Sequence, residues 1–567
     1  MRMCLAVGIG STALIAGAAF AAPPALKLPA GAETAARVID KGVLEGAVRF
    51  LADDLLEGRA PAHRGDELAC RYVASVMESL GLTPGAPGAK WEQRFEIVGI
   101  TTTDPETWAF RSKGSETALR FWEDFIAASG VQTPEVAISD AELVFVGYGI
   151  QAPEYGWDDF KGTDLKGKVL VMMNNDPDWD PNLFAGKRRL YYGRWSYKFE
   201  SAARQGAVGA IIIHTTPSAG YGWQVVQNSW TGEQFELPAG SEPRVQLRGW
   251  TTEDATRRIL AIGGFDLDAL VTLARSREFR PVPLGIRTSI RFANALRRAE
   301  TANVLGLIPG RDPVLKDQVV VFSAHHDHFG IGKPNAKGDA IYKGAVDNAS
   351  GVAQVLAIAK AFMALPERPS RSILFAVVSL EEFGLLGSAY YAANPTFPPE
   401  RIAADINFDA GNIFGKTRDV AVVGKGKSSL DAVVGAAAAM QGRVIVDETF
   451  PERGAYYRSD HLSFARIGVP GLYFRGGLDY IGREPGWGLK VTEEWGVANY
   501  HQPSDEWNEG WNFDGMIEDT QLGFFAGLAV ADADGMPTWT PGDEFAKLRA
   551  TAAGAAATHG PNPGGHR

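Results

Sequence analysis

The sequence predicts an α/β protein in which a mostly parallel central sheet is covered by helices. From residue 303 onward, short apolar runs alternate with helical patterns, which is typical of a parallel sheet with helices on both faces. Histidine and carboxylate side chains follow several of these runs directly. Residues 106–292 contain closely spaced apolar runs with few helical patterns, so we expect a β-rich α+β domain inserted into the α/β domain.

The composition is that of a globular, acidic chain. Of its 567 residues 45% are hydrophobic, and 14 are Trp, so it can bury large cores and does not resemble a disordered, collagenous or coiled-coil protein. The 56 Lys and Arg residues are outnumbered by 67 Asp and Glu residues, which gives a net charge of −11. We therefore expect neither a nucleic-acid partner nor binding to an anionic lipid surface.

The first 21 residues have the pattern of a signal peptide. Arg2 precedes an apolar stretch from Leu5 to Phe20, and Ala19-Phe20-Ala21 supplies a small-x-small cleavage site. We predict cleavage after Ala21, because the stretch is shorter than the roughly 20 apolar residues that span a bilayer. The mature protein is then expected to be periplasmic or extracellular, without a stable membrane anchor.

The rest of the chain divides into four predicted segments. Residues 22–105, with helical patterns at about 35–55 and 65–81, form the N-terminal part of the main domain. The insert covers 106–292, and the larger, C-terminal portion of the main domain covers 293–540. An Ala-, Gly- and Pro-rich tail at 541–567 is predicted to be disordered.

Polar side chains follow three predicted strands of the main domain. Predicted strands lie at 319–324, 373–380, 403–408 and 470–474, and a helix with a 3.6-residue period begins near 349. The polar residues that follow the first three strands are His325 and Asp327, Glu381 and Glu382, and Asp409. Because the carboxyl ends of parallel strands line one crevice, we expect these groups to converge. Asp347, at the start of the helix, and His501, in a later loop, are expected to join them.

So many carboxylates in one crevice would repel one another strongly unless cations compensated them. A mixed set of imidazoles and carboxylates favours zinc, with manganese or cobalt as alternatives. Five ligands without cysteine suit two metal ions roughly 3.5–4 Å apart that share a carboxylate and a water. In the Glu381-Glu382 pair, one carboxylate can bind metal while the other takes the proton of the water. Asp327 could accept the second N–H of His325. Strand alternation would turn His326 and His328 to the face opposite His325 and Asp327, so we assign them to packing or to the pocket wall.

Six motifs resemble those of the secreted di-zinc aminopeptidase family, and they occur in that family's order. They are Ser323-Ala-His-His-Asp-His-Phe-Gly, Gly344-Ala-Val-Asp-Asn-Ala-Ser-Gly, Leu380-Glu-Glu-Phe-Gly-Leu-Leu-Gly-Ser, Asn407-Phe-Asp-Ala-Gly, Ser459-Asp-His-Leu-Ser-Phe and Tyr500-His-Gln-Pro-Ser-Asp. The family also contains glutamate carboxypeptidase, the transferrin receptor and glutaminyl cyclase. The insert resembles the family's protease-associated domain, so the resemblance covers nearly all of residues 40–530.

The resemblance implies a role for each matching residue. It makes Asp347 the carboxylate that bridges two zinc ions, with His325 and Asp409 on one ion and Glu382 and His501 on the other. It makes Glu381 the general base. Tyr456 matches the spacing of a tyrosine that steadies the oxyanion, although Tyr457 is adjacent to it.

The implied activity is hydrolysis of N-terminal residues from peptides by a metallo-aminopeptidase. A carboxypeptidase of the glutamate carboxypeptidase type is the first alternative, and it would need basic groups near the metals, for which Arg194, Arg458, Arg475 and Arg483 are available. A glutaminyl cyclase-like acyltransferase works with one zinc, and a non-catalytic receptor need not keep the ligands together with a base. The insert could wall the active site, restrict substrate size or mediate contacts in a homodimer.

Overall fold

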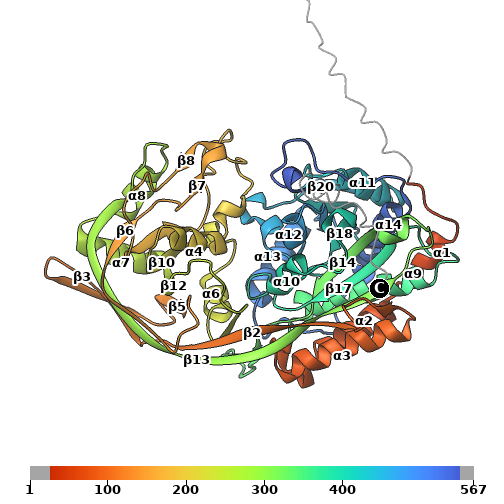
Figure 1. The fold of residues 1–567 in the computed structure, drawn as a ribbon, viewed down its shortest axis with the longest axis horizontal. Helices are drawn as coiled ribbons and strands as arrows, with labels where there is room; N and C mark the ends of the chain where they lie inside the picture. Colours follow the sequence, from red (N-terminus) through yellow and green to blue (C-terminus); the bar gives the residue numbers. More distant parts are fainter. Residues whose placement is uncertain (1–25, 550–567) are drawn as a thin grey trace, which may run out of the picture.

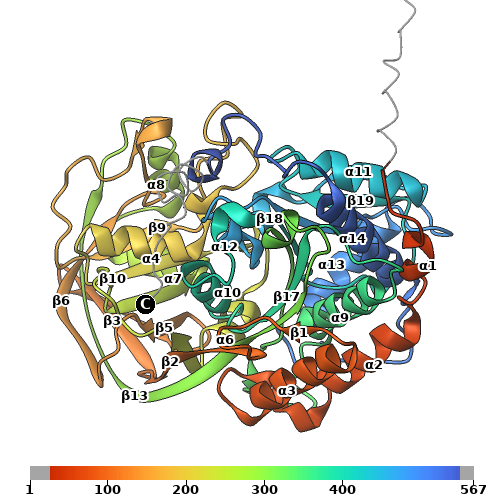
Figure 2. The same ribbon diagram turned by 45° about the vertical axis from the view of Figure 1, so that its right-hand side comes forward.

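The computed structural model describes residues 26–549, which form two parts joined by a long pair of strands (Figures 1 and 2). The predicted signal peptide lies outside the described residues, as do residues 550–567 of the predicted tail. Within 26–549, no helix combines the length and the apolar character that crossing a membrane requires.

The main part is built on a mixed sheet with a parallel centre. Its strands lie in the order β1 (Thr83–Pro84), β13 (Val282–Ile308), β17 (Ser372–Val378), β14 (Val319–His325), β18 (Ile402–Asn407), β21 (Gly471–Gly476), β19 (Asp419–Val423) and β20 (Val444–Asp447). The central strands β17, β14, β18 and β21 are parallel to one another, whereas β13 and β19 pair antiparallel with their neighbours in this centre. The predicted α/β fold class is therefore confirmed.

Helices cover both faces of this sheet, as Figure 2 shows around β17 and β18. One layer contains α1 (Ala32–Ala36), α2 (Lys41–Leu51), α3 (Arg64–Ser79), α9 (Ser350–Met363), α11 (Leu430–Met440) and α14 (Asp514–Asp532). The other face carries α10 (Leu386–Ala393) and α12 (His461–Ala465). Nearly every side chain of α9 is buried, which is why the sequence of this helix is apolar almost all round.

The insert has its own group of strands, which joins those of the main part through β13, and its own core. Its strands β6 (Glu135–Phe145), β9 (Val169–Met173), β10 (Gly209–His214) and β12 (Leu247–Thr252) pair parallel in that order, and β5 (Phe125–Ser129) pairs antiparallel with β12. Its helices are α4 (Trp195–Arg204), α5 (Thr216–Ala219), α6 (Trp223–Ser229), α7 (Glu253–Gly263) and α8 (Leu267–Ala274). The aromatic side chains of Trp108, Phe145 and Trp250 are fully buried here, so the insert does not depend on the core of the main part for its own hydrophobic burial.

Two long strands connect the parts. β2 (Glu92–Thr103) pairs antiparallel with β13 over twelve positions, and the earlier half of β13 pairs with β6 and with β3 (Thr107–Ser112) of the insert. β3 continues the insert into β4 (Ser115–Arg120), and β11 (Glu233–Glu236) returns to pair with β2. The limits expected for the insert, 106–292, thus fall just after β2 and within β13, which both parts share (Figure 1).

Part of the tail expected to be disordered is ordered. Residues 541–549 pack against the main part, where the ring of Phe545 is 7% exposed and lies 5.3 Å from that of Trp539 and 6.2 Å from that of Tyr456. The expectation was based on the Ala, Gly and Pro content of the tail and did not take the single aromatic residue Phe545 into account. The expectation of disorder is therefore wrong for residues 541–549.

Candidate metal centre

Neighbouring parallel strands bring their carboxyl ends to one edge of the main sheet. β14 ends at His325, whose Cα pairs with that of Val378 in β17, and Ser323 pairs with Asn407 in β18. The segments that leave β17 and β18 beside His325 carry the Glu381-Glu382 pair and Asp409. The register of the sheet therefore brings together residues that are far apart in the sequence, as expected.

Asp347 lies at the centre of the resulting cluster. Its Oδ1 is 3.3 Å from Nε2 of His325, and its Oδ2 is 3.3 Å from Nε2 of His501. Asp409 Oδ1 lies 3.7 Å from Nε2 of His325, and Glu382 Oε2 lies 3.2 Å from Nε2 of His501. All five predicted metal ligands thus meet in two overlapping groups that share Asp347.

Glu381 lies beside the first of these groups and is held in place by Asp327. Glu381 Oε2 is 3.9 Å from Nε2 of His325. The buried carboxylate of Asp327 accepts hydrogen bonds from the backbone N–H of Glu381 (3.1 Å) and of Glu382 (3.4 Å). Nδ1 of His325 is 3.3 Å from the carbonyl oxygen of Asp327 and 3.6 Å from its carboxylate. Asp327 thus contacts His325, and it also orients both glutamates.

Asp505 holds the turn that carries Asp347. Its carboxylate accepts hydrogen bonds from the backbone N–H of Val346 (2.9 Å) and of Asp347 (3.0 Å). Burial raises the pKa of Asp505 to about 7, although these two hydrogen bonds act in the opposite direction. Asp505 is the last residue of the motif that begins at Tyr500, so this short loop supplies His501 and also fixes Asp347.

The two remaining histidines of the first motif differ from each other. His326 turns away from the cluster, where its Nε2 is 2.8 Å from Asp66 Oδ1 and 3.5 Å from Cys70 Sγ. His328 instead reaches the cluster, with Nδ1 2.6 Å from Glu382 Oε1. Placing His328 on the face opposite His325 was therefore wrong, because β14 ends at His325 and strand alternation does not continue beyond it.

The electrostatics of the cluster favour a divalent cation. Burial, then repulsion from Asp347 and Glu381, raises the pKa of Glu382 well above its usual range, and burial raises that of Glu381 in the same way. Nε2 of His325 and Nε2 of His328 are buried without a hydrogen-bond partner. Nε2 of His325 faces Asp347 and Asp409, and an unpaired imidazole nitrogen among mutually repelling carboxylates is the kind of donor expected at a zinc site, so the residues fit the predicted metal.

Tyr456, the predicted oxyanion partner, lies in a different cluster. Its ring is 3% exposed and packs edge-on against that of His461 at 4.6 Å, with Lys427 Nζ 4.8 Å from its centre. After burial, the groups that raise its pKa most are Asp543 and Glu544 of the ordered tail, and Tyr457 donates a hydrogen bond of 2.5 Å to Glu544. Both tyrosines are thus engaged with the tail segment.

Tyr500 lies beside the carboxylates of the cluster. Its ring centroid is 3.8 Å from that of His501. Burial, then the negative charges of Asp347, Glu382 and Glu381, raises the pKa of Tyr500 well above its usual range, which keeps its hydroxyl protonated as a donor. Sequence reasoning missed this residue, although its position directly before His501 was a usable signal.

The insert also reaches the cluster. Asn228 Nδ2 donates a hydrogen bond of 2.9 Å to the carbonyl oxygen of His501, and Ser229 Oγ lies 2.8 Å from His501 Nδ1. Trp195 approaches Gly384, in the turn that follows Glu381, so closely that a Cβ on that glycine would lie 3.5 Å from the indole. Nothing in the sequence links Ser229 or Asn228 to His501, because they lie in different parts of the fold.

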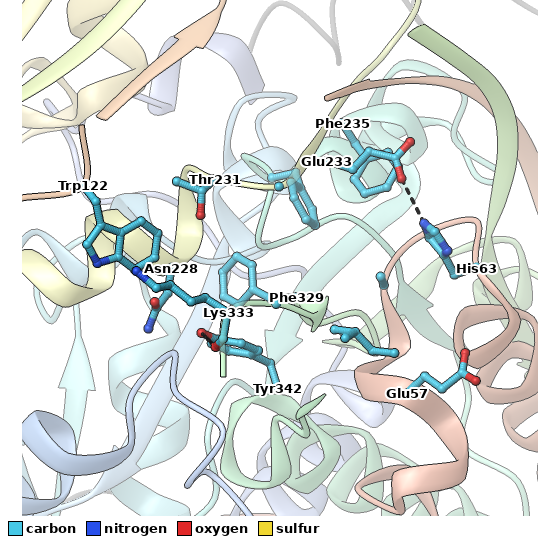
Figure 3. Close-up of a pocket in the computed structure, with 15 residues that line it drawn as sticks. Glu57, His63, Trp122, Asn228, Thr231, Glu233, Phe235, Phe329, Lys333 and Tyr342 are labelled. Atoms are coloured by element: carbon cyan, nitrogen blue, oxygen red, sulfur yellow. Dashed lines mark hydrogen bonds and ion pairs between the residues drawn. The ribbon is translucent and has the colours of Figure 1, made fainter. Parts of the chain in front are cut away.

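A cavity of about 490 Å³ lies between the insert and the main part, on the side of Phe329 (Figure 3). Trp122 and Asn228 come from the insert, and Phe329 and Tyr342 come from the main part. The ring of Phe329 is 4.7 Å from that of His501. The wall of the cavity is therefore also a support of the metal-ligand candidate His501.

A narrow crevice between the two parts is lined by four arginines, namely Arg189, Arg194, Arg453 and Arg458. The Arg189 side chain is 5% exposed, and burial lowers its pKa to about 10. Within residues 26–549 the guanidinium groups of Arg189 and Arg194 form no ion pair, whereas Arg453 lies 3.6 Å from Glu493. Arg194 is close enough to Glu381 for that carboxylate to oppose the effect of burial on its pKa. The crevice therefore gathers positive charge beside the cluster, although Asp176 partly offsets that of Arg189.

Comparison with known proteins matches residues 303–524 to the model described as Peptidase family M28. Aminopeptidase NAALADL1 of Mus musculus is 34% identical over 132 residues, which are 22% of this chain and 16% of that protein. A probable zinc metalloprotease of Pyricularia oryzae is 40% identical over 92 residues, which are 16% of this chain and 17% of that protein. The chain thus spans about a sixth of the length of these curated relatives.

One solved structure has the same overall fold. The aminopeptidase from Aneurinibacillus sp. strain AM-1 superimposes with a TM-score of 0.50 and 19% sequence identity, covering 90% of this chain and 98% of that one. At this identity the likeness concerns the fold, and it extends over both the insert and the main part.

His461 predicts how stability changes with pH. Its side chain is fully buried, and burial lowers its pKa to about 3. In the unfolded chain this imidazole binds a proton near pH 6.5, whereas in the folded protein it stays neutral until about pH 3. Its contribution to the free energy of unfolding is therefore complete above pH 6.5 and is lost as the pH falls toward 3. Between pH 7.0 and 5.5 the wild type should therefore lose about 1.3 kcal/mol more unfolding free energy than His461→Asn. Urea unfolding at both pH values measures this, and parallel pH curves for the two proteins would refute it.

Proposed function

We infer that residues 303–524, which belong to peptidase family M28, form the catalytic part of a zinc-dependent aminopeptidase. The observation that carries this proposal is the Asp347 carboxylate, whose two oxygens lie 3.3 Å from the imidazoles of His325 and His501. A carboxylate shared between two ligand groups is the arrangement that a two-metal hydrolase requires. The aminopeptidase and metalloprotease names of the relatives are in accord with it.

The donor set divides into two zinc sites. His325 and Asp409 would hold one ion, Glu382 and His501 would hold the other, and Asp347 would contact both. Manganese or cobalt could occupy the same positions. When bound, such ions would supply Lewis-acid chemistry that polarises a peptide carbonyl and lowers the pKa of a water toward neutral pH.

Glu381 is the proposed general base. Glu382 lies within 2.6 Å of His328 and 3.2 Å of His501, whereas the nearest imidazole nitrogen to Glu381 is Nε2 of His325, at 3.9 Å. A carboxylate with a raised pKa in a buried site can take a proton from the attacking water and return it to the leaving amine. The backbone bond from Glu381 to Asp327 fixes the position of this base.

Tyr500 takes the oxyanion role that the sequence resemblance assigned to Tyr456. The hydroxyl of Tyr500 stays protonated beside Asp347 and the two glutamates, so it can donate a hydrogen bond to a developing negative charge. Tyr456 is enclosed by His461, Lys427 and the tail. The packing therefore favours Tyr500 for this step.

The arginine crevice supports a second candidate function. The unpaired guanidinium groups of Arg189 and Arg194 would stabilise a carboxylate of the substrate. That carboxylate could belong to an acidic side chain of an aminopeptidase substrate or to the C-terminus of a carboxypeptidase substrate. Of the four arginines that the sequence suggested, Arg194 and Arg458 line the crevice. Arg475 instead lies 5.1 Å from the Tyr473 ring, and Arg483 lies 4.4 Å from the Trp487 ring.

The predicted signal peptide supports a periplasmic or extracellular location for this activity. There the insert, as a protease-associated domain, would form one wall of the active site, because Asn228 contacts His501 and Trp195 lies beside the turn that follows Glu381. This wall would favour short peptides over folded protein substrates.

The aminopeptidase proposal predicts which peptide end must be free. The zinc-loaded protein should release N-terminal residues from free-amine peptides, should leave N-acetylated peptides intact, and should lose activity with a chelator. Chromatography of a panel that also includes C-amidated peptides checks this. Cleavage that survives N-acetylation but fails on C-amidation would indicate a carboxypeptidase, and cyclisation of an N-terminal Gln peptide without hydrolysis would indicate the cyclase.

The role of Glu381 predicts a variant that keeps its metal but loses its rate. Glu381→Ala should lower kcat at least about 10²-fold, the usual size of general-base loss, because the neighbouring carboxylates Asp347, Asp409 and Glu382 would be occupied as metal ligands. Zinc content measured by elemental analysis should stay equal to that of the wild type. Unchanged turnover in this variant would remove Glu381 from the role.

The two tyrosine candidates predict opposite outcomes for a matched pair of variants. Tyr500→Phe should lower kcat about 10²-fold with little change in KM, because the lost hydrogen bond acts in the transition state. Tyr456→Phe should leave both constants within about twofold. Steady-state kinetics on one peptide decides between them, and the reverse pattern would restore the assignment to Tyr456.

A further inference from the structure

The insert makes two hydrogen bonds to one metal-ligand candidate of the main part. Ser229 Oγ lies 2.8 Å from His501 Nδ1, and Asn228 Nδ2 donates to the His501 carbonyl oxygen at 2.9 Å. Both residues lie at the end of α6, more than 270 positions before His501 in the sequence. A side-chain contact and a backbone contact therefore fix the same residue from the insert.

The two nitrogens of His501 have different partners. Nε2 faces Asp347 Oδ2 and Glu382 Oε2 at 3.3 and 3.2 Å, whereas Nδ1 faces Ser229. An imidazole that binds metal through Nε2 carries its proton on Nδ1, and a partner that accepts this proton sets the tautomer and the ring orientation. The Ser229 hydroxyl is placed to accept it.

The backbone of His501 also needs support. Its φ of 55° lies in the left-handed region, which a residue with a side chain adopts at a cost in free energy. The hydrogen bond from Asn228 holds the carbonyl group of this residue, and the rings of Tyr500 and Phe329 pack against the imidazole at 3.8 and 4.7 Å. The insert thus helps to maintain the conformation that directs Nε2 into the cluster.

Helix α6 is anchored inside the insert, so it can act as a rigid support. The indole N–H of Trp223 and the amide of Gln227 both donate to the carbonyl oxygen of Trp122, at 2.9 and 2.8 Å. Val226 is 1% exposed, and the ring of Trp230, directly after the helix, lies 4.8 Å from that of Trp195. The position of Ser229 is therefore set by the core of the insert.

We propose that Ser229 is a positioning residue through which the docked insert sets the affinity of the metal position formed by Glu382 and His501. This inference rests on the proposed two-zinc centre. It assigns the insert a part in building the metal site, in addition to lining the cleft. The position formed by His325 and Asp409 has no such contact with the insert among residues 26–549, so the effect should be confined to one of the two ions.

Ser229→Ala tests the inference through metal affinity. Removing the residue that is hydrogen-bonded to a metal ligand usually weakens metal binding roughly 10–100-fold. Titration of the metal-free protein with zinc in competition with a chelating dye should show one dissociation constant raised by about that factor and the other within about twofold. Ser229→Thr keeps the hydroxyl and should restore most of the affinity.

A control variant separates this contact from general weakening of the interface. Glu233 also joins the insert to the main part, through Arg297 at 2.8 Å and His63 at 2.9 Å, without touching His501. Glu233→Gln should leave both zinc affinities within about twofold. The visible absorption of the cobalt-loaded protein should change for Ser229→Ala and not for Glu233→Gln, because only the former alters the surroundings of a ligand.

Each outcome is decisive. Two zinc ions bound equally tightly by the wild type and by Ser229→Ala would overturn the inference while leaving the proposed function intact. If Ser229→Ala raised both zinc dissociation constants by the same factor, the serine would have a general structural role, and the inference would also be overturned. A wild type that binds fewer than two zinc ions would refute the two-metal centre first, and the inference with it.

Discussion

The site depends on compensation of negative charge that is buried at the carboxyl edge of a parallel sheet. Glu381, Glu382 and Asp409 meet there because the register of β14, β17 and β18 places the ends of these strands side by side, and Asp347 joins them from a turn that Asp505 holds. Burial and mutual repulsion raise the pKa values of the two glutamates, so a cation beside them would stabilise their charged forms. Asp327 and Asp505 hold these carboxylates close together despite their repulsion, so that a metal ion can compensate their charge.

The sequence was most informative where chemistry and topology coincide. A polar residue directly after an apolar run lies at a strand end, and parallel strand ends converge, so His325, Glu382 and Asp409 could be placed together from their positions alone. The same reasoning failed for His328, because it extended strand alternation beyond the last residue of β14. The spacing of Tyr456 gave no sign of the ordered tail, whose Phe545 ring lies 6.2 Å from that of Tyr456 and whose Glu544 accepts a hydrogen bond from Tyr457.

Contacts between distant segments could not be read from the sequence. Ser229 and Asn228 are ordinary residues at the end of a short helix, and only the docking of the insert onto the main part brings them to His501. The arginine crevice depends on the same docking, since Arg194 and Arg458 come from different parts. Single residues of this kind carry no periodic or compositional signal, whereas the fold class depends on many residues and is therefore well predicted.

The centre is also tied to the N-terminal helical layer, which bears on how metal binding relates to folding. Arg59 is fully buried and donates to the carbonyl oxygens of His326 (2.6 Å) and Gly344 (2.9 Å), which flank the ligands on either side. Asp66, in α3, binds the His326 ring. Together with the insert, these contacts mean that the ligands are oriented only when three segments of the chain have docked. A metal ion that binds only the completed fold stabilises the folded state relative to the unfolded states. Metal binding and folding therefore stabilise each other.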